Sequence, residues 1–370
     1  MTSDKPFSNT LTRRNFLKKF SQAALAISGG LALETLLGGC AIAPIFESAE
    51  DIANIKWDAN PAIPVPKDGC YVGWHRDIPT DLKYISPIAF PKLYQKLISS
   101  AVRDEKQLID FYRADYGKGP AVHSFSDRQI TDAWFPREIC EVAHNNRVIP
   151  LIRYYFFDDF KRVAKGDYDK YLIKFAQGAK EFGKPFFFVP YPEANIGAHT
   201  KHVHAWGGSG GKGFKEAWSR MHDIFEKAGA NEYAVWGLHL LSGGGQQPLS
   251  WFAVNEDFID WVGFSVYNLE RETGTNRSFH GILGDSYWWA KRKYPTKPIA
   301  LWEFGTSDTY RQGRWIIDAY KDIKKLPRIK LVVYAEYPIF GGSTPDSTMM
   351  RSSAKPDYKK ATSDLYFIGS

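Results

Sequence analysis

The sequence predicts an α/β fold, a (β/α)₈ TIM barrel formed by a single domain. Eight short runs rich in apolar and β-forming residues follow one another along the chain, and helical patterns separate most of them. Within each run the apolar residues are continuous rather than alternating, which is typical of strands buried on both faces of a parallel sheet. Strands that alternate with helices build right-handed βαβ units, and eight such units can close into a barrel.

An open, doubly wound parallel sheet is the alternative fold. Its dinucleotide-binding form carries the pattern GxGxxG after the first strand, where the glycines let the backbone approach a pyrophosphate. No such pattern follows the first apolar run at 70–75. The sequence therefore favours the closed barrel.

The first 39 residues predict an export signal. Residues 12–18 (TRRNFLK) contain the paired arginines of the twin-arginine route. The apolar stretch 23–37 is too short and too interrupted for a stable membrane span. Residues 37–40 (LGGC) resemble a lipobox, in which Cys40 starts the mature chain and carries acyl chains such as palmitate. We expect an exported, membrane-anchored lipoprotein that faces the periplasm or the cell exterior; a signal anchor with an incidental cysteine is the alternative.

Composition limits the class of partner. Residues 40–66 are rich in Pro, Ala and Asp and predict a lipid-anchored linker, which leaves 67–370 as the catalytic domain. The formal net charge of +7 includes no basic tract typical of nucleic-acid binding. The chain has 12 Trp, 20 Tyr and 25 Phe, and such rings can stack against sugars as well as fill a large core. Cys70 and Cys140 could pair in an exported protein.

The predicted elements alternate in order along this domain. The strands are expected at 70–75, 121–126, 148–156, 185–190, 233–241, 261–267, 298–304 and 329–337. Helical patterns lie at 93–112, 167–182, 212–228, 280–294 and 310–326. Gly183 and Gly229 follow two of these patterns directly and predict helix ends. The connection 242–260 is short and rich in Gly and Gln, so its helical pattern is weak.

Two glutamates at predicted strand ends indicate the chemistry. Glu193 follows the fourth strand and Glu303 lies at the end of the seventh. The carboxyl ends of barrel strands meet at one face, where active sites lie. Two carboxyl groups that face each other about 5–5.5 Å apart can cleave a glycosidic bond by double displacement. Glu193 would donate the proton and Glu303 would be the nucleophile.

Other residues near the strand ends complete a predicted substrate site. Tyr267 could donate its hydroxyl to Glu303, and Arg153 or Arg76 could hold the charge of that carboxylate. The predicted substrate-binding residues are Trp74, His75, Arg153, Asn195, Trp206, His239, Tyr267 and Trp302.

A histidine-rich loop at 199–204 raises the alternative of a zinc site. Three imidazoles lie within six residues, but no Cys or carboxylate is close by in the sequence and the spacing matches no zincin pattern. A polar loop that lines the cleft is the preferred interpretation. We therefore expect neither a metal nor a cofactor.

Three segments resemble glycoside hydrolase family 26. Residues 193–197 (EANIG), with Trp206 further on, resemble its acid/base motif, and 297–306 (KPIALWEFGT) resemble its nucleophile motif. Residues 260–268 (DWVGFSVYN) resemble its sixth-strand segment. The resemblance implies a retaining hydrolase of β-mannan or a related β-glycan, similar to the endo-β-mannanases, with Glu193 as acid/base and Glu303 as nucleophile.

The chain departs from the family pattern beside the acid/base. The family usually has a histidine there that helps to hold substrate and catalytic residues, and this chain has Pro192. Two alternatives to an enzyme follow: a carbohydrate-binding protein without catalysis, and an assembly factor for an exported polysaccharide. In each case we expect a monomer with a polysaccharide or oligosaccharide partner, and no nucleic acid.

Overall fold

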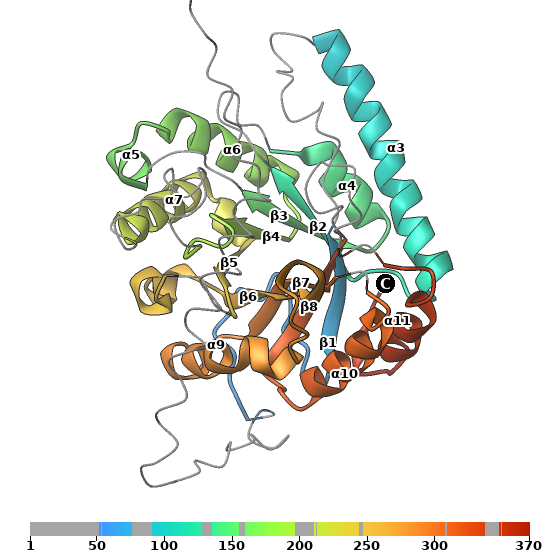
Figure 1. Ribbon diagram of the computed structural model, residues 1–370. Helices are drawn as coiled ribbons and strands as arrows, with labels where there is room; N and C mark the ends of the chain where they lie inside the picture. The colour runs from blue at the N-terminus through green and yellow to red at the C-terminus, as the bar shows by residue number, and fades with distance from the viewer. Residues whose placement is uncertain are drawn as a thin grey trace, which may run out of the picture.

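A closed parallel barrel lies at the centre of the protein (Figure 1). The computed structural model describes residues 52, 54–75, 91–127, 135–154, 160–196, 211, 213–243, 247–307, 309–336, 348 and 350–370. The strands are β1 (Cys70–His75), β2 (Val122–Asp127), β3 (Ile149–Tyr154), β4 (Phe186–Pro190), β5 (Ala234–Leu241), β6 (Trp261–Asn268), β7 (Ile299–Thr306) and β8 (Ile329–Ala335). They pair in chain order, and β1 closes the ring between β8 and β2. The predicted (β/α)₈ barrel is confirmed.

Helices cover the outside of this barrel (Figure 1). They are α3 (Pro91–Tyr116), α4 (Arg137–Asn145), α5 (Phe160–Lys165), α6 (Asp169–Phe182), α7 (Phe214–Ala228), α8 (Glu270–Thr273), α9 (Phe279–Lys293), α10 (Gln312–Lys324) and α11 (Lys355–Thr362). As predicted, α6 and α7 end at Gly183 and Gly229, which adopt left-handed φ values of 65° and 72°. The connection after β5 holds only the short 3₁₀ turns η4 (Leu249–Phe252) and η5 (Glu256–Phe258) in its described part.

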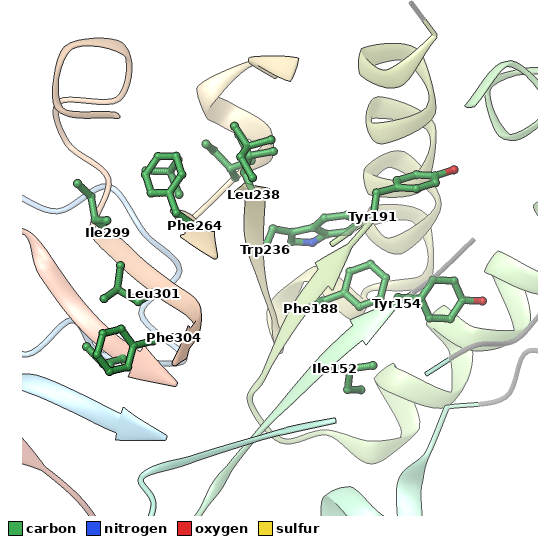
Figure 2. Packing of buried hydrophobic residues seen from close by; sticks show 14 of the residues in the cluster. Ile152, Tyr154, Phe188, Tyr191, Trp236, Leu238, Phe264, Ile299, Leu301 and Phe304 are labelled. Carbon is green, nitrogen blue, oxygen red and sulfur yellow. The ribbon is translucent and has the colours of Figure 1, made fainter. Parts of the chain in front are cut away.

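Each strand is buried on both faces, which explains its continuous apolar sequence. On β4, Phe186 and Phe188 point outward into the main cluster under the helices, whereas Phe187 and Val189 point into the barrel. Figure 2 shows Phe188 beside Trp236 in the outer cluster, at a ring-centroid distance of 4.9 Å. Two separate apolar layers therefore hold the strands in place from both sides.

The foot of the barrel is closed by residues 54–66, which belong to the segment predicted as a linker. Ile63 is 1% exposed and packs with the inner cluster. The Asn60 backbone N–H donates to Asp260 Oδ1 at 2.7 Å, and its amide group donates to the carbonyl of Asn231 at 2.8 Å. These contacts join the segment to the loops that precede β5 and β6, so the folded unit begins before residue 67. Isolated apolar residues among Pro and Asn carry no periodic signal, which is why the sequence did not predict it.

The cysteines, the C-terminal residues and the helix lengths complete the description of the fold. Cys70 and Cys140 are both buried and form no disulfide, and burial raises the pKa of the Cys70 thiol. A short ninth strand, β9 (Phe367–Ile368), adds to β1. In the part of the chain that the structure describes, no helix has the length and apolarity needed to cross a membrane. Cys40 and the predicted signal lie outside that part.

Candidate active site

Glu193 lies on an irregular loop directly after β4. It is half-buried, and its backbone has the left-handed φ of 55°; Tyr191, two residues earlier, has φ 51°. Residues other than glycine adopt this conformation at a cost of about 1–3 kcal/mol each, and such strain gathers at functional sites. Two strained residues on either side of Pro192 therefore single out this loop.

Buried side chains hold the loop in its strained conformation. The Tyr191 ring packs against Phe160 and Phe214, at centroid distances of 4.9 and 6.0 Å. Asn195 is fully buried and bridges to β5: it accepts from the Leu241 N–H at 2.6 Å and donates to the Leu241 carbonyl at 3.1 Å. Asn195 therefore shapes the loop rather than offering its amide to a substrate, in contrast to the prediction.

A β-bulge in β7 turns Glu303 toward the inside of the barrel. Leu301 and Phe304 both belong to the outer cluster (Figure 2), and Trp302 belongs to the inner one. Strict alternation would point Glu303 outward. The register shifts against both neighbouring strands at this position, however, and such a bulge re-aims a side chain. Trp302 and Glu303 consequently both face inward.

Both carboxylate oxygens of Glu303 have partners. Arg153 on β3 forms an ion pair with Oε1, and the Tyr267 hydroxyl on β6 donates to Oε2. Arg153 is 1% exposed and Glu303 is 5% exposed. A buried cation and a phenolic donor both favour the ionised carboxylate. Tyr267 and Arg153 thus contact Glu303 as expected; Arg76, the other arginine considered for this role, lies outside the described residues.

A polar layer lies beneath Arg153. Its Nη2 donates to Ser126 Oγ at 2.8 Å and contacts His75 Nε2 at 2.6 Å. His75 Nδ1 lies 2.9 Å from Ser124 Oγ. The parallel register places Ser124 beside His75 and Ser126 beside Arg153. Ser124 was not predicted, although the alternation of β2 (VHSFSD) places it on the same inward face as Ser126.

Comparison with known proteins identifies the barrel type. No protein-family model matches the chain. The structure superimposes on GH26A from Muricauda sp. with a TM-score of 0.53 and 14% identity, over 81% of this chain and 91% of that chain. It matches Bacillus subtilis mannanase with a TM-score of 0.54 and 14% identity, over 82% and 87% of the two chains.

The chain shares its barrel fold with these solved structures. The Cellulomonas fimi endo-β-1,4-mannanase double mutant also matches, with a TM-score of 0.55 and 15% identity over 81% of this chain and 72% of that one. By sequence, endoglucanase H of Acetivibrio thermocellus is 23% identical over 233 residues, which cover 60% of this chain and 25% of that protein. The chain thus spans a quarter of the length of that curated relative.

Two of the predicted substrate residues lie in the core of the barrel. Trp74 is 1% exposed and stacks against both Tyr112 and Tyr116 of α3, at centroid distances of 4.5 and 4.6 Å. Trp302 is fully buried inside the barrel, where its Nε1 donates to the Leu238 carbonyl at 2.9 Å. Because both indoles are buried, neither can stack on a sugar ring. Aromatic residues near strand ends can pack in the core as well as bind a substrate.

The second imidazole near the site, His239 on β5, is also fully buried rather than exposed to a substrate. Its Nε2 lies 2.7 Å from Ser265 Oγ, and its carbonyl accepts from the Ala194 N–H of the Glu193 loop. Burial, then the positive charge of Arg153, lowers the pKa of His239 well below its usual value of 6.5. His239 therefore stays neutral in the folded protein and links the Glu193 loop to β5 and β6.

This shift predicts how stability responds to acid. Below pH 6.5 the unfolded chain takes up a proton at His239 while the folded protein does not. The free energy of unfolding therefore decreases as the pH is lowered. The slope from this residue is about 1.4 kcal/mol per pH unit. We expect His239→Gln to lose that part of the slope in urea unfolding measured at pH 7 and pH 5. An unchanged difference between the two pH values would contradict the assignment.

The remaining predicted residues lie outside the described part. Trp206 and the histidine loop at 199–204 are among them. Among the residues with described positions, no cluster of three or more His, Cys, Asp or Glu could hold a metal ion. The candidate active site therefore comprises Glu303 with Tyr267 and Arg153, His75 behind Arg153, and the strained loop that carries Glu193 after β4.

Proposed function

We propose that the protein is a retaining glycoside hydrolase that cleaves a β-linked polysaccharide, β-mannan or a related β-glycan. The observation that carries the proposal is the bulge of β7, which turns Glu303 inward onto Arg153 and Tyr267. A register shift interrupts the hydrogen-bond ladder, and bulges are frequent beside active sites, where they re-aim a side chain. The strained, half-buried Glu193 on the loop after β4 supplies the second carboxyl group.

The mechanism follows from the different surroundings of the two glutamates. Glu303, ionised beside Arg153, attacks the anomeric carbon while Glu193 protonates the departing glycosidic oxygen. Glu193 then removes a proton from water, which attacks the glycosyl-enzyme intermediate and restores both residues. Tyr267 holds Oε2 of Glu303, so that the attacking oxygen keeps one orientation.

The relatives support the substrate class. The matched structures are named as mannanases and endo-β-1,4-mannanases, and the sequence relative is named as an endoglucanase. All of these names describe enzymes that act on β-linked glycans. The low identities show the fold alone, so the sugar and linkage come to this chain as part of the proposal.

One observation favours a second candidate, a carbohydrate-binding protein or polysaccharide assembly factor without catalysis. Glu303 is held on both oxygens, and Pro192 stands where the family usually has a histidine. A strongly paired carboxylate is a weaker nucleophile because its charge is already neutralised. The barrel would then serve to hold a glycan.

Hydrolysis and its stereochemistry distinguish the two candidates. The wild-type protein is incubated with β-mannan, glucomannan, β-1,3-xylan and mixed-linkage β-glucan, and new reducing ends are followed by ¹H NMR. The proposed mechanism predicts products released first in the β configuration. Release in the α configuration would overturn double displacement, and binding without cleavage across all four glycans would favour the second candidate.

We also propose that the protein is exported and anchored through a lipid on Cys40. The twin-arginine segment at 12–18 and LGGC at 37–40 support this. Cys40→Ser should move the protein from the membrane fraction to the soluble fraction. Retention of this variant in the membrane would count against the lipid.

A further inference from the structure

A chain of buried polar groups leads from Ser124 through His75 and Arg153 to Glu303. His75 is the last residue of β1 and is fully buried. Its Nε2 meets Nη2 of Arg153 at 2.6 Å, and Arg153 in turn pairs with Glu303. On its other side, His75 Nδ1 lies 2.9 Å from Ser124 Oγ. The imidazole therefore lies between a serine hydroxyl and the guanidinium that holds the proposed nucleophile.

The contact with arginine determines which ring nitrogen carries the proton. A guanidinium has five N–H donors and no acceptor. Nε2 of His75 must therefore present its lone pair to Arg153, and in the neutral ring the proton resides on Nδ1. A serine hydroxyl can accept a hydrogen bond as well as donate one, so Ser124 Oγ accepts from Nδ1–H.

We propose that His75 is a positioning residue that holds Arg153 against Glu303, and that it does so only as the neutral ring with its proton on Nδ1. This rests on the proposed function only for its effect on catalysis. The predicted contact of His75 with substrate is replaced by this role, because the ring is fully buried. Protonation of Nε2 would remove the acceptor and set two cations against each other, so the guanidinium would turn away from Glu303.

Other charged groups around His75 act in both directions. Arg153 on β3 opposes a positive charge on the ring. Glu336 follows β8, and its backbone N–H donates to the His75 carbonyl. Its negative charge favours a positive charge on the His75 ring. Its carboxylate already accepts from the Met350 N–H at 3.0 Å and from the Tyr116 hydroxyl at 3.4 Å. His239 on β5 is neutral, and the charge of Glu303 on β7 is met by Arg153. The direct contact with arginine therefore dominates.

The tautomer can be observed without any substrate. Long-range ¹H–¹⁵N correlation spectra of the ¹⁵N-histidine-labelled protein at pH 7 assign the proton of each imidazole, and the signals of His75 are assigned by their loss in His75→Gln. We expect a neutral ring with the proton on Nδ1. A charged ring, or a proton on Nε2, would overturn the proposal whether or not the protein hydrolyses a glycan.

Kinetics then test the effect on Glu303. In His75→Gln the side-chain carbonyl replaces Nε2 as an acceptor that cannot titrate; in His75→Leu no acceptor remains. We expect His75→Leu to lower kcat about 10²-fold with little change in KM, as a displaced reacting group does. His75→Gln should retain most of kcat and move the acid limb of its pH profile to lower pH. His144, half-buried beside the carbonyl of Pro185, provides the control His144→Gln, with an unchanged acid limb.

Equal kcat values for the wild type and both His75 variants, with equal acid limbs, would overturn the positioning role. A wild type that cleaves none of the four glycans would instead overturn the proposed function and leave the tautomer assignment standing. Circular dichroism of each variant separates a kinetic effect from loss of the fold.

Discussion

Glu303→Gln is expected to reduce kcat on the cleaved β-glycan by about 10⁴-fold or more, as the loss of a covalent nucleophile does. The amide keeps the shape of the carboxylate and an oxygen for Arg153, so the fold and substrate binding should persist. What is lost is the negative charge that attacks the anomeric carbon. Initial rates with wild type and variant, together with binding of the same glycan by calorimetry, measure the two effects separately.

A second buried glutamate supplies the matched control. Glu336 lies at the end of the neighbouring strand and accepts a hydrogen bond from the Met350 N–H at 3.0 Å, which a glutamine oxygen can also accept. Glu336→Gln should therefore leave kcat close to that of the wild type. Similar losses in both variants would show a general effect of buried carboxylates and would contradict the special role of Glu303.

Azide separates the roles of the two glutamates further. In Glu303→Ala, azide can occupy the space of the lost carboxylate and attack the substrate directly, which yields an α-glycosyl azide. In Glu193→Ala, the glycosyl-enzyme still forms from a substrate with a good leaving group, and azide then yields a β-glycosyl azide. The opposite configurations, or no rescue in either variant, would show that the roles are assigned wrongly.

The strands could be predicted from the sequence because each is apolar on both faces. A run such as PFFFVP has no polar residue to misplace, and β4 begins one residue inside the predicted range and ends at its last residue. The barrel foot could not be predicted in this way. Ile63 lies in the segment PAIPVP, which has no helical or strand periodicity. Only the folded structure shows that Ile63 packs with the inner cluster of the barrel.

The meeting of three residues in the candidate site was predictable from the sequence, but the burial of the other predicted residues was not. Glu303, Tyr267 and Arg153 meet as expected, because the carboxyl ends of parallel strands converge. Which side chains are exposed depends on strand phase, and the bulge of β7 changes that phase without a mark in the sequence. Trp302 and His75 were thus expected in contact with substrate, and the structure places both behind the surface.

The bulge also has a consequence for stability, which Gly263→Ala should reveal. Trp302 faces inward against β5 and β6, and a Cβ at Gly263 would lie 2.1 Å from the Ala300 carbonyl oxygen and 2.6 Å from Trp302 Nε1. Real Cβ atoms do not approach this closely, so β6 and β7 would have to separate. We expect the free energy of unfolding in urea to fall by about 3 kcal/mol, the upper range for overpacking.

A glycine with open surroundings gives the control. Gly284 lies in α9, and a methyl group attached to its Cα would have no heavy atom of another element within 4 Å. Gly284→Ala should therefore stabilise the protein by about 0.5–1 kcal/mol through helix propensity. If Gly263→Ala unfolds at the same urea concentration as the wild type, that result would contradict the close packing of Gly263 against Ala300 and Trp302.

A double-mutant cycle identifies the atoms that cause the effect. At Gly237 a Cβ would meet Trp302 Cζ2 at 2.5 Å, and the close contacts at this position are with side chains alone. Trp302→Leu should therefore relieve much of the cost of Gly237→Ala, giving a coupling free energy of about 1 kcal/mol or more between the two. The same replacement should relieve little of the cost of Gly263→Ala, because the backbone oxygen of Ala300 remains. Equal relief at both glycines would mean that the indole, and not the bulged backbone, limits how closely β6 and β7 approach beneath Glu303.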